Sequence, residues 1–242
     1  MNFFSPRVMV LAGKELRSWI KSFALYGITV FFLLFVSIRF YFFQRFFAMD
    51  TAGLRPFFSG FPLAFILLVP ALTMKAWAEE KKSGSIELLF TLPFSEWELV
   101  WGKFLSCVTL LFGMLLFSLP VPLSILPLGH FDPGVILSEY AGALLLGICS
   151  ISLGLFFSSF CKNQAAAFFT VAVLLMALML GNSLAQYMPS AFGAFINYIS
   201  FSFHYESFSR GVLDSRDIAF FLFATGLFLF LNTQVLVFGK WS

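Results

Sequence analysis

The densest group of charged side chains in this 242-residue chain lies between Trp77 and Pro93. The segment reads WAEEKKSGSIELLFTLP and separates two long apolar runs. Ordering such a segment costs conformational entropy, so a charged connection with its own short helix indicates a binding partner. Residues of these types can dock another protein and transmit force to the runs on either side. The alternative is a helix that lies on the lipid surface without a partner.

Residues with catalytic or metal-binding chemistry do not form a recognisable set. His130 and His204 are far apart in the sequence, and His204 with Glu206 supplies at most two metal ligands. A metal site normally needs three or four ligands. The three cysteines form no CxxC pair and suit small apolar packing positions. We therefore predict no catalytic, cofactor-binding or metal-binding residues in the chain.

Nucleotide and nucleic-acid binding are not expected either. The phosphate-binding pattern GxxxxGK[ST] is missing, because none of the Gly-Lys pairs at 13–14, 102–103 and 239–240 precedes Ser or Thr. The net charge of +3 is small and spread along the sequence, whereas a nucleic-acid interface would need a clustered basic face. The chain is thus expected to hydrolyse no ATP by itself.

The composition predicts an all-α, polytopic membrane protein. The chain is 60% hydrophobic and 11% charged, whereas soluble domains carry about 25% charged residues. A membrane-spanning helix needs about 20 apolar residues, and inside lipid a helix satisfies its own backbone hydrogen bonds. The sequence predicts a single transmembrane domain over residues 1–242. Its six spans are expected at about residues 22–43, 57–76, 104–126, 135–160, 165–185 and 218–238.

Helix signals place shorter elements around the spans. Residues 6–21 predict an amphipathic interfacial helix with a basic face, although a solvated basic lead-in is the alternative. In the charged segment, residues 81–84 are expected to form a polar turn before a short helix that Pro93 ends. Ser95 and Glu98 then match a capping box that opens the next long helix. Residues 187–217, too broken for two crossings, predict an outer re-entrant segment between spans five and six.

The basic residues predict the orientation of the chain. With the N-terminus inside, ten Lys and Arg residues fall on the inner side and five on the outer side. The inner set is Arg7, Lys14, Arg17, Lys21, Lys75, Lys81, Lys82, Lys103, Lys162 and Lys240; the outer set is Arg39, Arg45, Arg55, Arg210 and Arg216. Both termini are therefore expected in the cytoplasm.

Several motifs resemble those of a known family. The run EEKKSGSIELL at residues 79–89, followed by TLP at 91–93, resembles the signature of ABC-2 type permeases, the membrane subunits of ABC exporters of the type V fold. KELR at 14–17 and KNQ at 162–164 agree with it. RPFF at 55–58 and SFSRGV at 207–212 resemble the gliding-motility group, whose relatives include the copper-centre maturation permease.

The resemblance implies a mechanism and a set of partners. In this family the segment after the second span is a cytoplasmic coupling helix that docks in a groove of a separate ATPase subunit. The resemblance places ATP and Mg on that partner, two copies of which would pair with two permease copies in the bacterial inner membrane. Membrane lipids and a periplasmic accessory protein are further expected partners. By position, the ATPase-contacting residues would be Glu79, Glu80, Gly84, Glu87, Leu88 and Leu89.

Two other functions remain as alternatives. The chain could be a membrane scaffold or mechanotransducer of an ATPase complex that moves no solute. It could also be a stand-alone secondary transporter, but such proteins usually bury ionisable residues at mid-membrane depth, and few lie deep within the predicted spans. The abundant Phe suits hydrophobic cargo, but Phe equally packs helices and faces lipid, so the sequence names no substrate.

Overall fold

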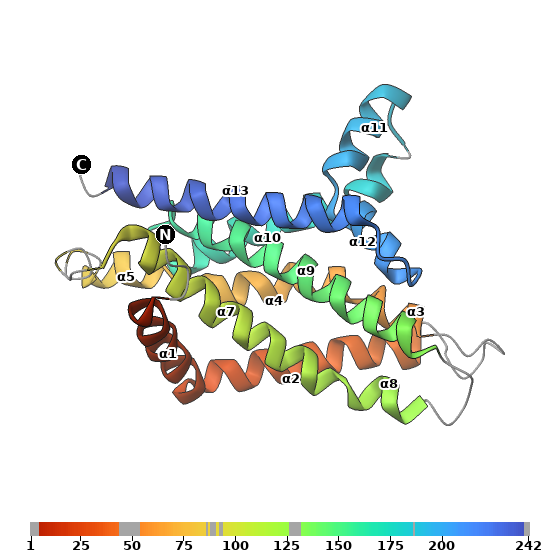
Figure 1. Cartoon of the computed structure of the whole chain (residues 1–242), viewed down its shortest axis with the longest axis horizontal. Helices are drawn as coiled ribbons and strands as arrows, with labels where there is room; N and C mark the ends of the chain where they lie inside the picture. The colour runs from red at the N-terminus through yellow and green to blue at the C-terminus, as the bar shows by residue number, and fades with distance from the viewer. Residues whose placement is uncertain are drawn as a thin grey trace.

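The helices of the protein run side by side as one elongated bundle (Figure 1). The structure is a computed structural model that describes residues 5–43, 54–85, 87, 91, 94–125, 132–185 and 187–239. The helix α1, the segment α5 and the last turn of α13 lie at the same end of the bundle (Figure 1). In order, the elements are α1 (Pro6–Lys21), α2 (Phe23–Ile38), the π-helix η1 (Arg39–Phe43), α3 (Arg55–Phe58), α4 (Phe61–Thr73), α5 (Ala78–Ser83), α7 (Glu96–Ser118), α8 (Pro120–Ile125), α9 (Pro133–Ser158), α10 (Gln164–Ala185), α11 (Ser190–Ile199), α12 (Phe201–Ser209) and α13 (Ser215–Gly239).

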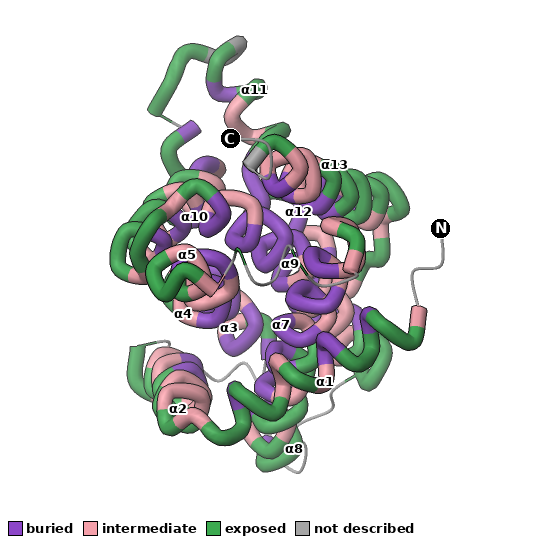
Figure 2. Tube along the Cα trace, turned by 90° about the vertical axis from the view of Figure 1, so that its left-hand side faces the viewer, coloured by how far each residue is buried: buried purple, intermediate pink, exposed green. Residues whose placement is uncertain are grey.

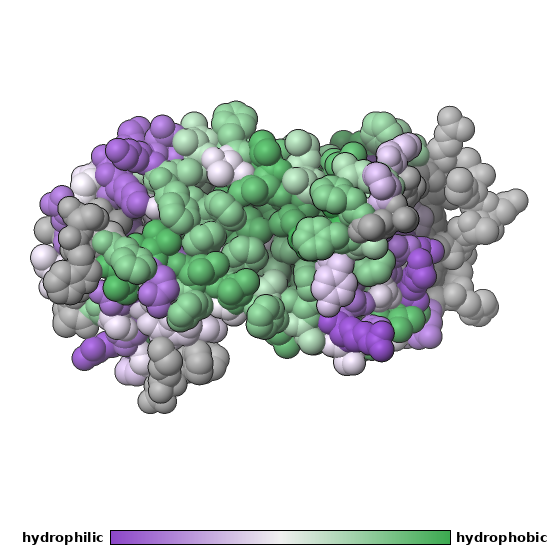
Figure 3. Space-filling model, turned by 90° about the horizontal axis from the view of Figure 1, so that it is seen from above, coloured by the Kyte–Doolittle hydropathy of each residue, from purple (hydrophilic) through white to green (hydrophobic). Residues whose placement is uncertain are grey.

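Among the described residues, six helical stretches are long and apolar enough to cross a membrane, which confirms the predicted number of spans. They are Phe23–Phe43, Arg55–Ser83, Glu96–Ile125, Pro133–Ser158, Gln164–Ala185 and Ser215–Phe238. The third stretch begins at Glu96, eight residues before the predicted start. The prediction placed the start too late because the first two turns of this helix carry the capping residues and are less apolar. Figure 3 shows a broad apolar belt between two polar ends, the surface that a bilayer requires.

Ser22 joins α1 to α2 without an intervening loop. Its backbone N–H donates to the Trp19 carbonyl oxygen at 2.9 Å, which closes α1. Its hydroxyl accepts the backbone N–H of Ala24 at 3.3 Å, which caps the start of α2. One residue therefore ends the first helix and begins the second.

The predicted capping box at the start of α7 is confirmed. The Ser95 hydroxyl accepts the Glu98 backbone N–H at 3.3 Å, and the Glu98 carboxylate accepts the Ser95 backbone N–H at 3.0 Å. At the other end, α7 stops at Ser118 and Pro120 begins the short α8. The break follows from the missing N–H of proline, which removes a helical hydrogen bond.

Helix α9 lies at the centre of the bundle. It packs against α4, α7, α10, α12 and α13. Buried positions gather on it and on its neighbours, whereas α2 stands at the edge of the bundle (Figure 2). Small residues allow these close approaches: a Cβ atom built on Gly142 would lie 2.3 Å from the Cβ of Phe208 in α12.

The region between the fifth and sixth spans forms two short helices, α11 and α12. Their 10 and 9 residues are too few to cross a bilayer, in line with the sequence analysis. Helix α12 returns to the bundle, where the Tyr205 hydroxyl donates to the Phe58 carbonyl oxygen at 3.1 Å. Helix α11 projects away from the long helices (Figure 1). Whether the segment dips into the outer leaflet stays a prediction.

The contact at Gly142 predicts a large effect of a very small substitution. Gly142→Ala must displace α12, because the clashing Phe208 Cβ is fixed to its backbone, and overpacking of this kind costs about 1–3 kcal/mol. We expect a lower midpoint of thermal unfolding in detergent. The matched control is Gly113→Ala in α7, where an added Cβ meets no atom within 4 Å. Equal unfolding midpoints for the two variants would show that α12 is not packed on α9 in this way.

Candidate functional site

The charged segment begins as the short helix α5, and this corrects the expected polar turn at residues 81–84. Acidic Glu79 and Glu80 occupy its first turn and basic Lys81 and Lys82 its last, an arrangement that favours the helix dipole. Gly84 ends the helix with φ of 71°, a left-handed conformation that glycine adopts without steric cost. The helix therefore continues through Ser83, and the chain turns at Gly84.

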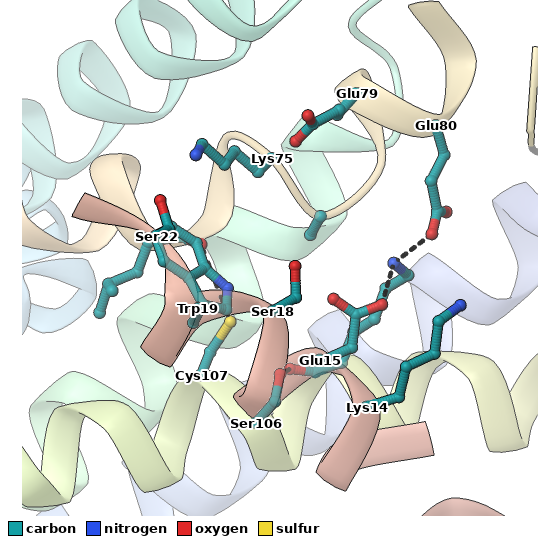
Figure 4. Close-up of a pocket in the computed structure, with 13 residues that line it drawn as sticks. Lys14, Glu15, Ser18, Trp19, Ser22, Lys75, Glu79, Glu80, Ser106 and Cys107 are labelled. Atoms are coloured by element: carbon teal, nitrogen blue, oxygen red, sulfur yellow. Dashed lines mark hydrogen bonds and ion pairs between the residues drawn. The ribbon is translucent and has the colours of Figure 1, made fainter. Parts of the chain in front are cut away.

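The ammonium group of Lys103 lies beneath α5 and joins three helices. Its Nζ is 2.6 Å from Glu80 Oε1 of α5 and 3.2 Å from Glu15 Oε1 of α1, while Lys103 itself belongs to α7. The Lys103 side chain is 3% exposed. Dashed lines in Figure 4 mark the two ion pairs. A buried charge without partners would be very costly, so these contacts fix the relative positions of α1, α5 and α7.

An aromatic ring completes the surroundings of Lys103. Its Nζ lies 4.9 Å from the ring centroid of Trp77, a fully buried residue just before α5. A cation over the face of an indole is favourable, and more so where water is excluded. We call Lys103, Glu15, Glu80 and Trp77 the Lys103 cluster.

Further contacts hold α1 along the first turns of α7. The Ser5 hydroxyl donates to Glu98 Oε1 at 3.0 Å, so the capping residue of α7 also binds the start of α1. Leu11 packs directly over Gly102, where a built Cβ would lie 2.5 Å from Leu11 Cδ2. Leu11 is thus part of the buried face of α1, although it interrupts the simple amphipathic pattern in the sequence.

Helix α5 is also bound to the end of the central helix. The Lys81 ammonium donates a hydrogen bond to the carbonyl oxygen of Ser159, the residue that caps the C-terminus of α9. A cation at the carboxyl end of a helix is favoured by the helix dipole. Together, Lys81 and the Lys103 cluster connect α5 to α1, α7 and α9.

A cavity of about 320 Å³ lies beside the Lys103 cluster, between α1, the α4–α5 segment and α7. Its lining is half polar and includes Lys14, Glu15, Ser18, Trp19, Ser22, Leu72, Lys75, Glu79, Glu80, Lys103 and Cys107. Figure 4 shows the lining side chains around it and labels most of them. We call it the boundary cavity, because it lies where α2 begins and α4 ends.

The structure separates the predicted site residues into two groups. Glu79 and Glu80 both line the boundary cavity, and Glu80 is engaged with Lys103. Gly84 and Glu87 are exposed beyond the end of α5. Leu88 and Leu89 lie outside the described residues.

Sequence reasoning missed the residues that hold the segment from below. Lys103 was assigned only to the inner basic residues, and Glu15 and Trp77 were given no role in a site. The available signal was a lysine within the first third of a long apolar helix, since a charge there must find partners. The partners themselves lie 88 and 23 residues away in sequence, so no local pattern identifies them.

The opposite end of the bundle carries separate polar contacts. His204 Nδ1 lies 2.7 Å from Asp217 Oδ1, and its Nε2 lies 2.9 Å from the Tyr198 carbonyl oxygen. Glu206 instead pairs with Arg210 at 2.6 Å and with Arg55 at 3.7 Å. His204 and Glu206 therefore do not act together, and within the described ranges no three metal-ligand side chains gather.

In the described part of the chain, six apolar spans and a charged segment held firmly after the second define a multi-pass membrane protein. A comparison with protein-family models matches residues 9–237 to the ABC-2 family transporter protein family, so the chain belongs to that family. It is a membrane permease component of an ABC transporter, a transport subunit that is not itself catalytic. Membership implies partnership with an ABC ATPase subunit. No curated protein matches the chain.

The Lys103 cluster gives a stability prediction. Lys103→Met leaves Glu15 and Glu80 as uncompensated carboxylates in a largely buried site, at a cost of about 3 kcal/mol. We expect a clearly lower thermal unfolding midpoint than for Lys82→Met, the exposed control in α5. The triple variant Lys103→Met, Glu15→Gln and Glu80→Gln should recover most of the loss, since it contains no lone charge. A Lys103→Met protein as stable as the control would contradict the role assigned to this ion pair.

Proposed function

We propose that the chain is the permease half of an ABC exporter and that the segment beginning at α5 receives force from a separate ATPase subunit. The observation that carries the proposal is the attachment of α5. Its buried side is bound to α1, α7 and α9, while Glu79, Gly84 and Glu87 are exposed. A surface that is exposed on one side and rigidly connected to several spans on the other is suited to transmit a push.

In the proposed mechanism, ATP binding closes the ATPase dimer, and the coupling segments of two permease copies move with it. The contacting residues would be Glu79, Gly84, Glu87, Leu88 and Leu89. Glu80 belongs to the same proposed set, and its ion pair with Lys103 gives it a positioning role within the segment. Motion of α5 would reach α7 and α1 together, because one ammonium group binds both glutamates.

The proposed assembly contains two permease chains, identical or homologous, and two ATPase chains. The least buried spans are Phe23–Phe43, Gln164–Ala185 and Ser215–Phe238. Of the 18-residue apolar segment within each span, 17%, 28% and 28% is buried, respectively. These surfaces are available to the second permease copy and to lipid. A periplasmic accessory protein would act at the opposite end. ATP and Mg would bind to the ATPase chains, with α5 on the cytoplasmic side of a bacterial inner membrane.

Substitutions in the exposed part of the segment test the coupling. Glu87→Lys reverses a charge on the proposed contact surface, and Gly84→Val forces a branched residue into a left-handed conformation. We expect either change to weaken copurification with the ATPase about tenfold and to reduce ATP turnover by the complex. Arg216→Glu, exposed at the opposite end, is the control. Unchanged assembly and turnover in both test variants would rule out this segment as the coupling element.

Labelling in intact cells tests the orientation. A membrane-impermeant maleimide should label Val212→Cys, which is 55% exposed, from outside. Ser83→Cys at the α5 end should react only after the membrane is permeabilised. Both variants are made in a Cys161→Ser background, because Cys107 and Cys149 are buried and Cys161 is partly exposed. Labelling of Ser83→Cys from outside would place the segment beyond reach of a cytoplasmic ATPase.

A further inference from the structure

The boundary cavity lies where the apolar belt of the bundle meets its polar end, next to the start of the first candidate span. Ser22, which lines it, directly precedes the first candidate span, and Leu72 lies one residue before the end of α4. The cavity therefore combines polar side chains from outside the apolar belt with apolar side chains from its edge. Its volume of about 320 Å³ is within the range of small-ligand sites, about 300–1,000 Å³.

Charges of both signs in the cavity have no ionic partner. Among the described residues, Lys75 forms no ion pair, and its ammonium lies 5.1 Å from the ring centroid of Trp19. Glu79 in the same lining likewise pairs with none of the described cations. In Figure 4 both side chains extend from the α4–α5 segment, with Ser18 and Ser22 of the α1 side below them. A ligand that carries one anionic and one cationic group would complement this arrangement.

Glu80 supplies an independent observation. Its Oε1 accepts from Lys103 at 2.6 Å, but its Oε2 is buried and has no hydrogen-bond partner in the described part of the chain. Leaving a buried carboxylate oxygen unsatisfied is costly. Once a small rotation of the Glu80 carboxylate turns Oε2 toward the cavity, a bound ammonium group with N–H donors would remove that cost.

We propose that the boundary cavity binds the head group of an amine-bearing phospholipid, with the phosphate beside Lys75 and the primary ammonium beside Glu79 and Glu80. A choline head group has no N–H to donate to Glu80, and a phosphoglycerol head group brings no cation for Glu79. The proposal depends on the cavity alone and does not require the proposed coupling role of α5.

A lipid rather than a free head group is favoured by the adjoining surface. Phe23, the first residue of α2, directly follows Ser22 and is 88% exposed. Apolar surface for acyl chains therefore begins beside the polar cavity. Trp19, with its ring under Lys75, has the amphipathic character that suits the membrane interface.

Native mass spectrometry of the full chain in detergent tests the proposal. The probes are phosphatidylethanolamine, phosphatidylcholine and phosphatidylglycerol with identical acyl chains, and free phosphoethanolamine as competitor. We expect about tenfold stronger retention of phosphatidylethanolamine than of the other two lipids, the size of one charge-assisted hydrogen bond. Lys75→Ala and Glu79→Ala should each remove most of that preference, whereas Lys82→Ala, outside the cavity, should keep it.

Other outcomes would overturn the proposal. Equal retention of the three lipids would indicate general contact with the apolar belt. Preference that survives in both Lys75→Ala and Glu79→Ala would place the lipid elsewhere. Free phosphoethanolamine that displaces the lipid at equal concentration would identify a soluble ligand instead. Lys75 and Glu79 make no ion pair with the described residues, so both variants should fold, and their thermal unfolding midpoints verify this.

Discussion

A single ammonium group, that of Lys103, determines how the polar end of this protein is built. It is buried at the edge of the apolar belt, where a charge is tolerated only with partners, and its partners come from α1 and α5. Neither helix can shift independently without leaving a carboxylate or the ammonium uncompensated. The Trp77 ring covers a further side of the ammonium group. The position of the charged segment after the second span is therefore a consequence of one ion-pair cluster rather than of a self-supporting loop.

This constraint defines which parts of the permease can move as a unit. Helices α1, α5 and the first turns of α7 form one connected body, and Lys81 extends it to the end of α9 through Ser159. At the other end, α12 is attached by Tyr205 to the Phe58 carbonyl and by His204 to Asp217. Between these ends the packing is mainly apolar, with close contacts such as Gly147 against Leu111. Polar contacts at both ends and mainly apolar packing between them suit a bundle whose helices tilt together, since the ion pairs at each end can move with the helices that carry them.

The sequence predicted the elements more fully than their connections. Hydropathy is a local property, so the six spans followed from apolar runs of sufficient length, and the capping box of Ser95 and Glu98 followed from residues three apart. The polar turn predicted at residues 81–84 was wrong, because the helix-favouring run of Glu and Lys continues α5 through Ser83 and only Gly84 ends it. The Lys103 cluster could not be predicted in detail: it depends on which faces of α1, α5 and α7 meet, and tertiary packing sets those faces. The family signature located the segment but gave no information about what supports it.

The shared residue between α1 and α2 has a consequence for how this protein can change over evolution. Most helix connections tolerate added or lost residues, because a loop absorbs the difference. Between α1 and α2 there is no loop to absorb such a change, because Ser22 completes one helix and starts the next. An insertion of one residue within α1 would turn the part before it by about 100° relative to α2. Leu11 and Glu15 would then face away from Gly102 and Lys103. The geometry of Ser22, Leu11 and Glu15 therefore constrains the length of this first helix, whereas residues on its exposed face take no part in these contacts.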